Sequence, residues 1–184
     1  MKVRFCRYII DLYDNIPEGL YWLFLGVLCV GCLYSFIVYG LNRGLKLSSR
    51  LLLTEHVVLI YLITVFFREE LSVQKFKLMP LWSYRIYLKE GEMYMLIENI
   101  MNILVFIPIG VLLGLSFEKI CLKTVFLTGM ILSLSVEVMQ FVTVRGLAEF
   151  DDLMHNTIGC ILGYGVFFLF KMVYEDLSKK SVEV

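Results

Sequence analysis

Residues 98–117 have the sequence ENIMNILVFIPIGVLLGLSF, and this stretch decides how the chain meets a membrane. Its purely apolar part, 103–117, is fifteen residues long, or about 22 Å at about 1.5 Å per residue. Because a hydrocarbon core is about 30 Å thick, a spanning helix has to extend back through Asn102 and Asn99 towards Glu98. The sequence therefore forces three polar side chains into or against the hydrocarbon.

The next two apolar segments of the chain also carry polar side chains, and these are Ser135, Glu137, Gln140, Asp151, Asp152 and Asn156. The first three come near the end of one segment, and the last three open the next. Consecutive spanning helices alternate in direction, so a helix start, the following helix end and the next helix start share one side of the membrane. A buried charge costs about 2.5–3.5 kcal/mol on insertion scales, so we predict a functional polar site in this leaflet.

Composition indicates the same class of protein. The chain has 184 residues, is 59% hydrophobic and only 18% charged, with a mean hydropathy of +0.79. A soluble domain is about 25% charged. Seventeen basic residues balance seventeen acidic ones, and no basic stripe is present, so nucleic acid is excluded as a partner. Five cysteines, an odd number, argue against a disulfide framework.

We predict an all-α fold, a polytopic membrane helical bundle of about five transmembrane helices with a short N-terminal interfacial helix. The spans are expected at 19–41, 51–67, 98–117, 122–142 and 154–174. Within the polar connection 68–92, we expect an amphipathic segment at the membrane surface. We expect Pro108 to kink its helix. Glycines four residues apart predict close helix packing, and they are Gly110 with Gly114 and Gly159 with Gly163.

The distribution of basic residues predicts the orientation. The connection with Arg43, Lys46 and Arg50 contains no acid, whereas 143–152 has one basic residue and three acids. We therefore predict an outside N-terminus and an inside C-terminus, which places the polar site at the outer leaflet.

The predicted binding residues are Glu98, Asn99, Asn102, Glu137, Gln140, Arg145, Asp152 and Asn156. Glu137 lies about 8 Å from the end of its helix, too deep to reach water fully. Glu137 and Asp152 are also the candidate catalytic residues. No cofactor and no metal are predicted, because Asp151, His155 and Glu137 offer ligand atoms without an established spacing. The competing interpretation is that these groups only tie helices together.

Several motifs in this region resemble those of the VanZ-like family, named for the teicoplanin-resistance protein of glycopeptide-resistant bacteria. They are MPLW (79–82), NIMNILVFIPIG (99–110), SVEVMQ (135–140), Arg145, FDDLMHNTIG (150–159) and Gly163. The resemblance covers about residues 76–170. It divides the chain into an N-terminal part (1–75), a VanZ-like core (76–174) and a polar tail (175–184). The resemblance implies a multi-pass protein of the bacterial cytoplasmic membrane that acts in the cell envelope.

The sequence departs from the common Arg-x-x-Asp-x-x-Asp pattern of the family. Arg145 is followed by Gly-Leu-Ala-Glu149, so Glu149 lies one place away from the first acid, while Asp152 matches the second. A role that needs the first acid in register is therefore in doubt.

Three functions remain open from the sequence. One is an envelope protein that binds membrane lipids, a lipid-linked wall precursor or a lipoglycopeptide and so changes susceptibility to teicoplanin-type compounds. A second is an intramembrane enzyme that uses Glu137 and Asp152 as an acid/base pair on a lipid. A third is a structural partner of another envelope protein.

Overall fold

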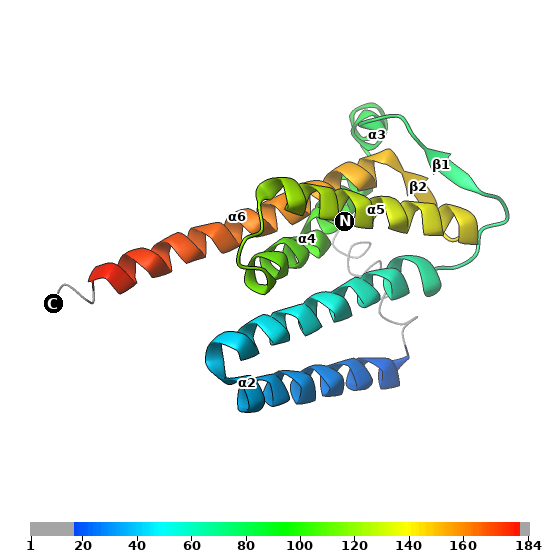
Figure 1. Cartoon of the computed structure of the whole chain (residues 1–184). Helices are drawn as coiled ribbons and strands as arrows, with labels where there is room; N and C mark the ends of the chain where they lie inside the picture. Colours follow the sequence, from blue (N-terminus) through cyan, green and yellow to red (C-terminus); the bar gives the residue numbers. More distant parts are fainter. Residues whose placement is uncertain (1–16, 181–184) are drawn as a thin grey trace.

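The computed structural model describes residues 17–180, and within them the fold is an all-α bundle (Figure 1). The elements in order are α2 (Glu18–Tyr61), the π-helix η1 (Leu62–Phe66), β1 (Lys75–Lys77), α3 (Trp82–Glu90), α4 (Met93–Ser116), α5 (Leu122–Thr143), β2 (Leu147–Glu149) and α6 (Phe150–Lys180). The predicted fold class is confirmed. The predicted N-terminal interfacial helix lies outside the described residues.

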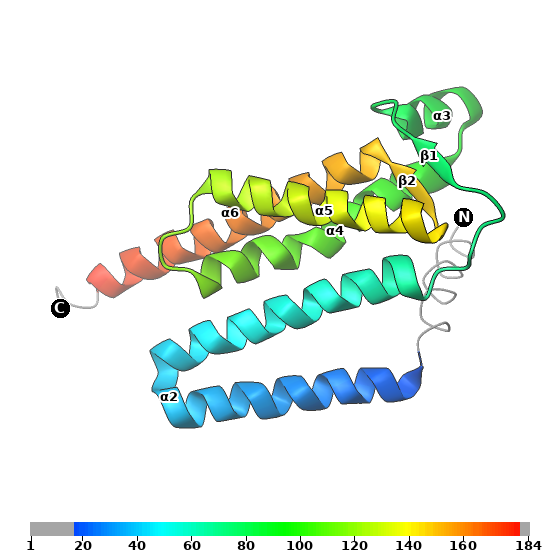
Figure 2. The same ribbon diagram turned by 45° about the vertical axis from the view of Figure 1, so that its right-hand side comes forward.

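Four helical stretches of the described chain are long and apolar enough to cross a membrane, namely Trp22–Phe66, Met93–Ser116, Leu122–Thr143 and Phe150–Asp176. The first of them contains two helices, because the backbone of Gly40 (φ 70°, ψ −176°) is non-helical. Figure 2 shows the two halves of α2 side by side. If each half of α2 crosses the membrane, the chain crosses it five times. This number of crossings remains a prediction.

The bend in α2 is sharper than the sequence indicated. We expected a loop between spans at 19–41 and 51–67, but helix resumes directly after Gly40. A positive φ is readily adopted by glycine because it lacks Cβ, so one residue suffices to reverse the chain. The basic residues Arg43, Lys46 and Arg50 therefore lie on a helix rather than in a loop.

Helices α4 and α6 pack at backbone contact, as the glycine spacing predicted. A Cβ added at Gly110 would lie 1.9 Å from the Cys160 carbonyl oxygen, and one at Gly163 would lie 1.9 Å from the Ile107 carbonyl oxygen. Only glycine fits at either position. Helix α4 continues through Pro108 as one helix from Met93 to Ser116.

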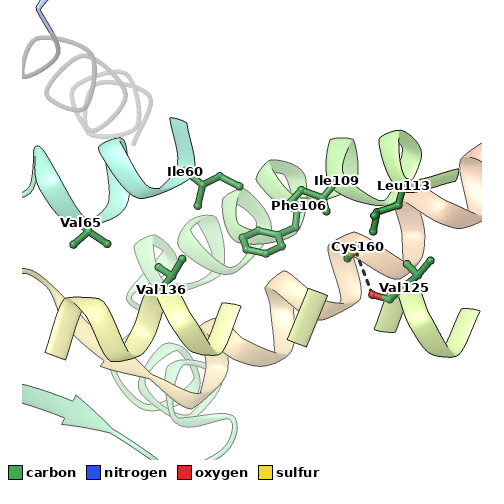
Figure 3. Packing of buried hydrophobic residues seen from close by; sticks show 8 residues of the cluster. All are labelled: Ile60, Val65, Phe106, Ile109, Leu113, Val125, Val136 and Cys160. Carbon is green, nitrogen blue, oxygen red and sulfur yellow. Dashed lines mark hydrogen bonds between the residues drawn. The ribbon is translucent and has the colours of Figure 1, made fainter. Parts of the chain in front are cut away.

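The apolar core lies between α4, α5, α6 and the end of α2 (Figure 3). Its buried members are Ile60, Val65, Phe106, Ile109, Leu113, Val125, Val136 and Cys160. The Cys160 thiol lies 3.6 Å from the Val125 carbonyl oxygen.

Three short elements outside the bundle, α3, β1 and β2, cover one end of it. β1 pairs in parallel with β2, with Phe76 opposite Ala148, and α3 follows β1 directly. Both views place α3, β1 and β2 together at one end, opposite the Gly40 bend and the α4–α5 turn (Figures 1 and 2). The connection 68–92 thus contains a helix in the expected segment, together with the strand β1, which periodicity did not indicate.

A cavity of about 260 Å³ separates the two halves of α2. Its lining is apolar apart from Thr54 and Glu55, and both carboxylate oxygens of the buried Glu55 lack a hydrogen-bond partner among the described residues. An unsatisfied buried polar group costs about 1–3 kcal/mol.

We expect Glu55→Leu to stabilise the protein by about 1–3 kcal/mol, because it removes this unsatisfied group. Thermal unfolding in detergent measures the change. Glu55→Gln is the matched control, since it keeps a polar group in the same place and should gain little. A lower melting temperature for Glu55→Leu would show that the carboxylate has a partner.

Candidate functional site

The residues predicted to form the polar site belong to helix ends that lie at one end of the bundle, beside α3 and the β1–β2 pair (Figure 2). The start of α4, the end of α5 and the start of α6 all reach this end. Alternating helix direction is the reason, because each of these helices runs opposite to the one before it.

Four carboxylates form what we call the acidic cluster: Glu98 on α4, Glu137 on α5, Glu149 at the end of β2 and Asp152 on α6. Asp152 interacts electrostatically with Glu137, Glu98 and Glu149, and Glu149 interacts with Glu137. Glu137 is buried, with 7% of its surface exposed. It therefore does not face lipid, which is what the predicted site required.

Arg68, which follows η1, is a cation that acts on three of these acids, Glu98, Glu137 and Asp152. Its guanidinium lies over Gly146, where an added Cβ would be 2.5 Å from Nη1. Gly146 has a φ of 99°, a conformation that favours glycine. Its lack of a Cβ also leaves the space that the Arg68 guanidinium occupies. One guanidinium among four carboxylates leaves the cluster with excess negative charge when all are ionised.

Hydrogen bonds connect the strand to the cluster. The Glu149 backbone N–H donates to Glu137 Oε2 at 2.8 Å, and the Trp82 indole donates to Glu149 Oε2 at 2.7 Å. Burial, together with the nearby charge of Asp152, raises the pKa of Glu149 from 4.5 to about 8. Glu149 is therefore part of the cluster although it lies one place out of the family register.

We expect the pKa of Glu149 to make stability depend on pH. A carboxyl that holds its proton more tightly when folded contributes stability that is full below about pH 4.5 and is lost as pH rises through about 8. The melting temperature should fall further between about pH 5 and 9 in the wild type than in Glu149→Gln.

A second measurement follows the same proton directly. In a Trp22→Phe background, Trp82 is the remaining tryptophan, and its fluorescence should titrate with a midpoint near pH 8. Adding Glu149→Gln should remove this titration. An unchanged titration in the Glu149→Gln protein would contradict the assignment.

Asp151 has a different role from its neighbour Asp152. Its side chain is fully buried and accepts hydrogen bonds from the Leu81 N–H at 2.5 Å, the Ser83 N–H at 3.0 Å and the Ser83 hydroxyl at 2.6 Å. Asn99 donates to the same Ser83 oxygen at 3.0 Å. Asp151 and Asn99 thus fix α3 to the bundle.

Both ring nitrogens of His155 also have hydrogen-bond partners. Its Nδ1 lies 2.6 Å from the Asp151 carbonyl oxygen, and its Nε2 lies 2.8 Å from the Tyr84 hydroxyl. No group of three or more potential ligands among the described His, Cys, Asp and Glu residues is arranged to hold a metal. Asp151 and His155 are instead joined to the α3 turn.

Two predicted amides bridge helices. Asn156 donates to the Ser133 hydroxyl at 2.9 Å, which joins α6 to α5. Gln140 donates to the Thr64 carbonyl oxygen at 3.0 Å, which joins α5 to η1. These contacts are those expected of residues that tie helices together.

The remaining predicted residues lie at the edge of the site. Arg145 donates to the Phe66 carbonyl oxygen at 2.7 Å, whereas Arg68 is the cation that acts on the acids. Asn102 is partly buried on α4. Binding roles for both stay predictions.

Sequence reasoning missed Arg68, Ser83 and Trp82 as members of the site. They lie in or beside the connection 68–92, which has no spanning pattern. The available signal was the MPLW motif, which places Trp82 and the neighbouring Ser83 in a region shared with the family.

Comparison with known proteins supports the motif evidence. A model of the VanZ/LLP1 family matches residues 24–171. The chain belongs to the VanZ/LLP1 family. This match begins well before residue 76, so most of the first predicted span, which the motifs left outside, is part of the VanZ/LLP1 region.

A relative with a known name is similar to part of the chain. Protein VanZ of Enterococcus faecium is 38% identical over 66 residues, which are 36% of this chain and 41% of that protein. The chain thus spans less than half of the relative it matches. No solved structure matches this VanZ/LLP1 protein.

Proposed function

We propose that this membrane protein acts in the bacterial cell envelope by binding the polar head of an amphiphile at the acidic cluster, and that it thereby changes susceptibility to teicoplanin-type lipoglycopeptides. Membership of the VanZ/LLP1 family supports the setting in the cytoplasmic membrane. The acidic cluster supports the site.

The observation that carries the proposal is the grouping of four carboxyl groups in the cluster. Glu98, Glu137, Glu149 and Asp152 face one another with Arg68 as the cation acting on three of them. Such a site favours a head group that supplies hydrogen-bond donors or positive charge, such as amines, amides and hydroxyls. It suits a diphosphate less well, because it offers one guanidinium, that of Arg68, among four carboxyl groups. A glycopeptide head therefore fits better than the diphosphate of a lipid-linked precursor.

The surroundings of the cluster favour an amphiphile over a soluble ligand. Apolar side chains on the outer faces of the same helices are exposed to lipid: Ile100 by 55%, Val138 by 51% and Val142 by 63%. A head group at the cluster would leave an acyl tail beside these residues, within the bilayer. Burial of each methylene contributes about 0.8 kcal/mol.

Expression in a susceptible bacterium tests this function. Susceptibility to teicoplanin, which carries an acyl tail, should shift more than susceptibility to vancomycin, which does not. Equal shifts, or no shift with the protein present in the membrane, would contradict the proposal.

A second candidate function is an intramembrane enzyme. Asp152 interacts electrostatically with Glu137 in the acidic cluster, and an acid/base pair acting on a lipid would use these two carboxyl groups. An enzyme would leave a chemically altered lipid, whereas a binding protein would not. Mass spectrometry of lipid extracts with and without expression distinguishes the two functions. An unaltered lipid profile would contradict the enzymatic function.

A further inference from the structure

We propose that a second site, at the end of the bundle opposite the acidic cluster, binds the phosphate of an anionic phospholipid. A cavity of about 380 Å³ lies there between α2 and the α4–α5 turn. We call it the basic pocket, and its lining residues are Lys46, Arg50, Ser116, Phe117, Glu118 and Lys119.

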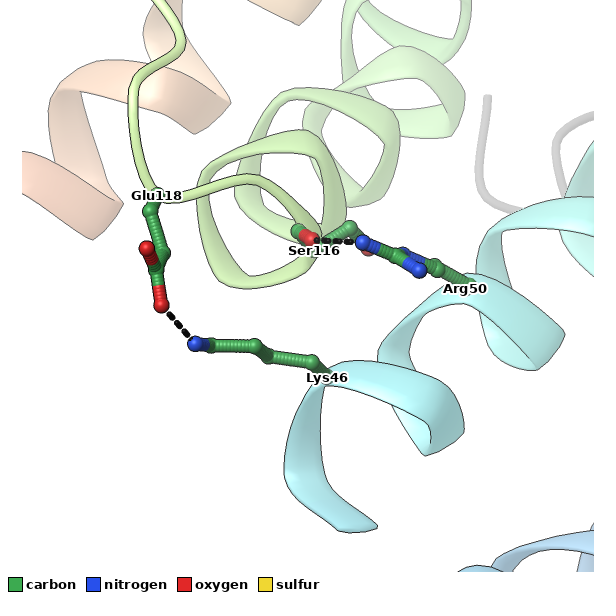
Figure 4. A network of polar contacts seen from close by, with 4 residues as sticks. All are labelled: Lys46, Arg50, Ser116 and Glu118. Carbon is green, nitrogen blue, oxygen red and sulfur yellow. Dashed lines mark hydrogen bonds and ion pairs between the residues drawn. The ribbon is translucent and has the colours of Figure 1, made fainter. Parts of the chain in front are cut away.

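Arg50 is held in place before any ligand arrives. Its Nη2 donates to the Ser116 carbonyl oxygen at 3.3 Å (Figure 4). Its guanidinium carbon lies 5.2 Å from the centre of the Phe117 ring. A guanidinium has five N–H donors in a planar fork that matches phosphate oxygens. Two fixed contacts lower the conformational entropy that Arg50 loses on binding.

The pocket also contains a buried hydroxyl that has no partner. Ser116 is 0% exposed, and its Oγ makes no hydrogen bond among the described residues. An unsatisfied buried hydroxyl favours a ligand that can accept its proton. A phosphate oxygen is such an acceptor, and Ser116 lines the basic pocket beside Arg50.

Lys46 and Glu118 form an ion pair across the mouth of the pocket (Figure 4). The pairing with Lys46 lowers the pKa of Glu118. The pair is exposed, and exposed ion pairs contribute little to stability. A phosphate can therefore bind Lys46 as well with little loss of free energy. The Glu118 carboxylate repels an anion, but the positive charges of Lys119 and Arg50 together exceed its single negative charge.

The charge of this end matches an anionic lipid. Segments 41–50 and 117–124 contain five basic residues and one acid. Basic pockets between transmembrane helices bind anionic head groups. Phe117, which lines the pocket, is 44% exposed, and Leu45, which precedes Lys46 in the sequence, is 45% exposed, so apolar surface is available near the pocket for the acyl chains of a bound lipid. These neighbours select a phospholipid over free phosphate.

Thermal unfolding of the purified protein in neutral detergent tests the site. Phosphatidylglycerol should raise the melting temperature of the wild type, and phosphatidylcholine should not. In Lys46→Gln/Arg50→Gln the apparent affinity for phosphatidylglycerol should fall by at least about tenfold. Lys75→Gln/Lys89→Gln, which removes two cations from the opposite end, is the matched control and should keep the shift.

Each other outcome overturns the site. An equal shift in the double variant would place the lipid elsewhere, and a full shift with inorganic phosphate would remove the lipid from the proposal. If the double variant does not fold, the Lys46→Gln and Ser116→Ala single variants replace it, and both should weaken the response. Unchanged responses in both would refute the pocket. The acidic cluster takes no part in this test.

Discussion

Gly163→Leu is expected to abolish the native bundle, whereas Gly165→Leu, two residues away on α6, is expected to leave it intact. A Cβ at Gly163 would lie 1.9 Å from the Ile107 carbonyl oxygen, while a Cβ at Gly165 meets nothing within 4 Å. Overpacking costs about 1–3 kcal/mol, and here the obstacle is backbone that cannot rotate away. We therefore expect a loss at or above the upper end of this range.

Melting temperature and the fraction of monodisperse protein after extraction measure the effect. Gly165→Leu controls for the helix propensity and the size of leucine at a neighbouring position. Similar stability in the two variants would show that α4 and α6 do not pack at backbone contact.

Glu137→Gln/Asp152→Asn is expected to remove the effect of the protein on teicoplanin susceptibility without unfolding it. Both substitutions keep the side-chain shape and remove charge from the centre of the acidic cluster. The Glu137 oxygen that accepts the Glu149 N–H is retained as an amide oxygen. Losing a charged hydrogen-bond partner costs about 1.5–3 kcal/mol of binding, or more than tenfold in affinity.

Glu90→Gln is the matched control, because Glu90 is an exposed acid at the end of α3 on the same side of the bundle. It should retain the wild-type effect on susceptibility. If the double variant also retains that effect while reaching the membrane in equal amount, the cluster does not carry the function.

The bundle could be predicted because its determinants are local. The apolar segments, and the four-residue spacing of Gly110 with Gly114 and of Gly159 with Gly163, are signals within single helices. The meeting of Glu98, Glu137 and Asp152 followed from helix direction alone. The bend at Gly40 was missed because a single glycine with positive φ leaves almost no polar loop to recognise.

The remaining parts of the site depend on long-range contacts that no spacing encodes. Arg68 reaches the acids because Gly146, 78 residues later, leaves room for its guanidinium. The β1–β2 pair is only three residues long on each side and gave no alternating pattern. Asp151 is one of the polar residues that open the last apolar segment, but its side chain accepts a hydrogen bond from Ser83 at the start of α3. We predicted only a surface segment within 68–92, but this connection contributes Arg68, Trp82 and Ser83 to the site.

Binding of teicoplanin to the purified protein in lipid nanodiscs tests the central claim most directly. We predict saturable binding to the wild type, weakened about tenfold or more in Glu137→Gln/Asp152→Asn, with Glu90→Gln unchanged. Equal affinity of the wild type and the double variant would contradict the account, as would the absence of saturable binding to the wild type.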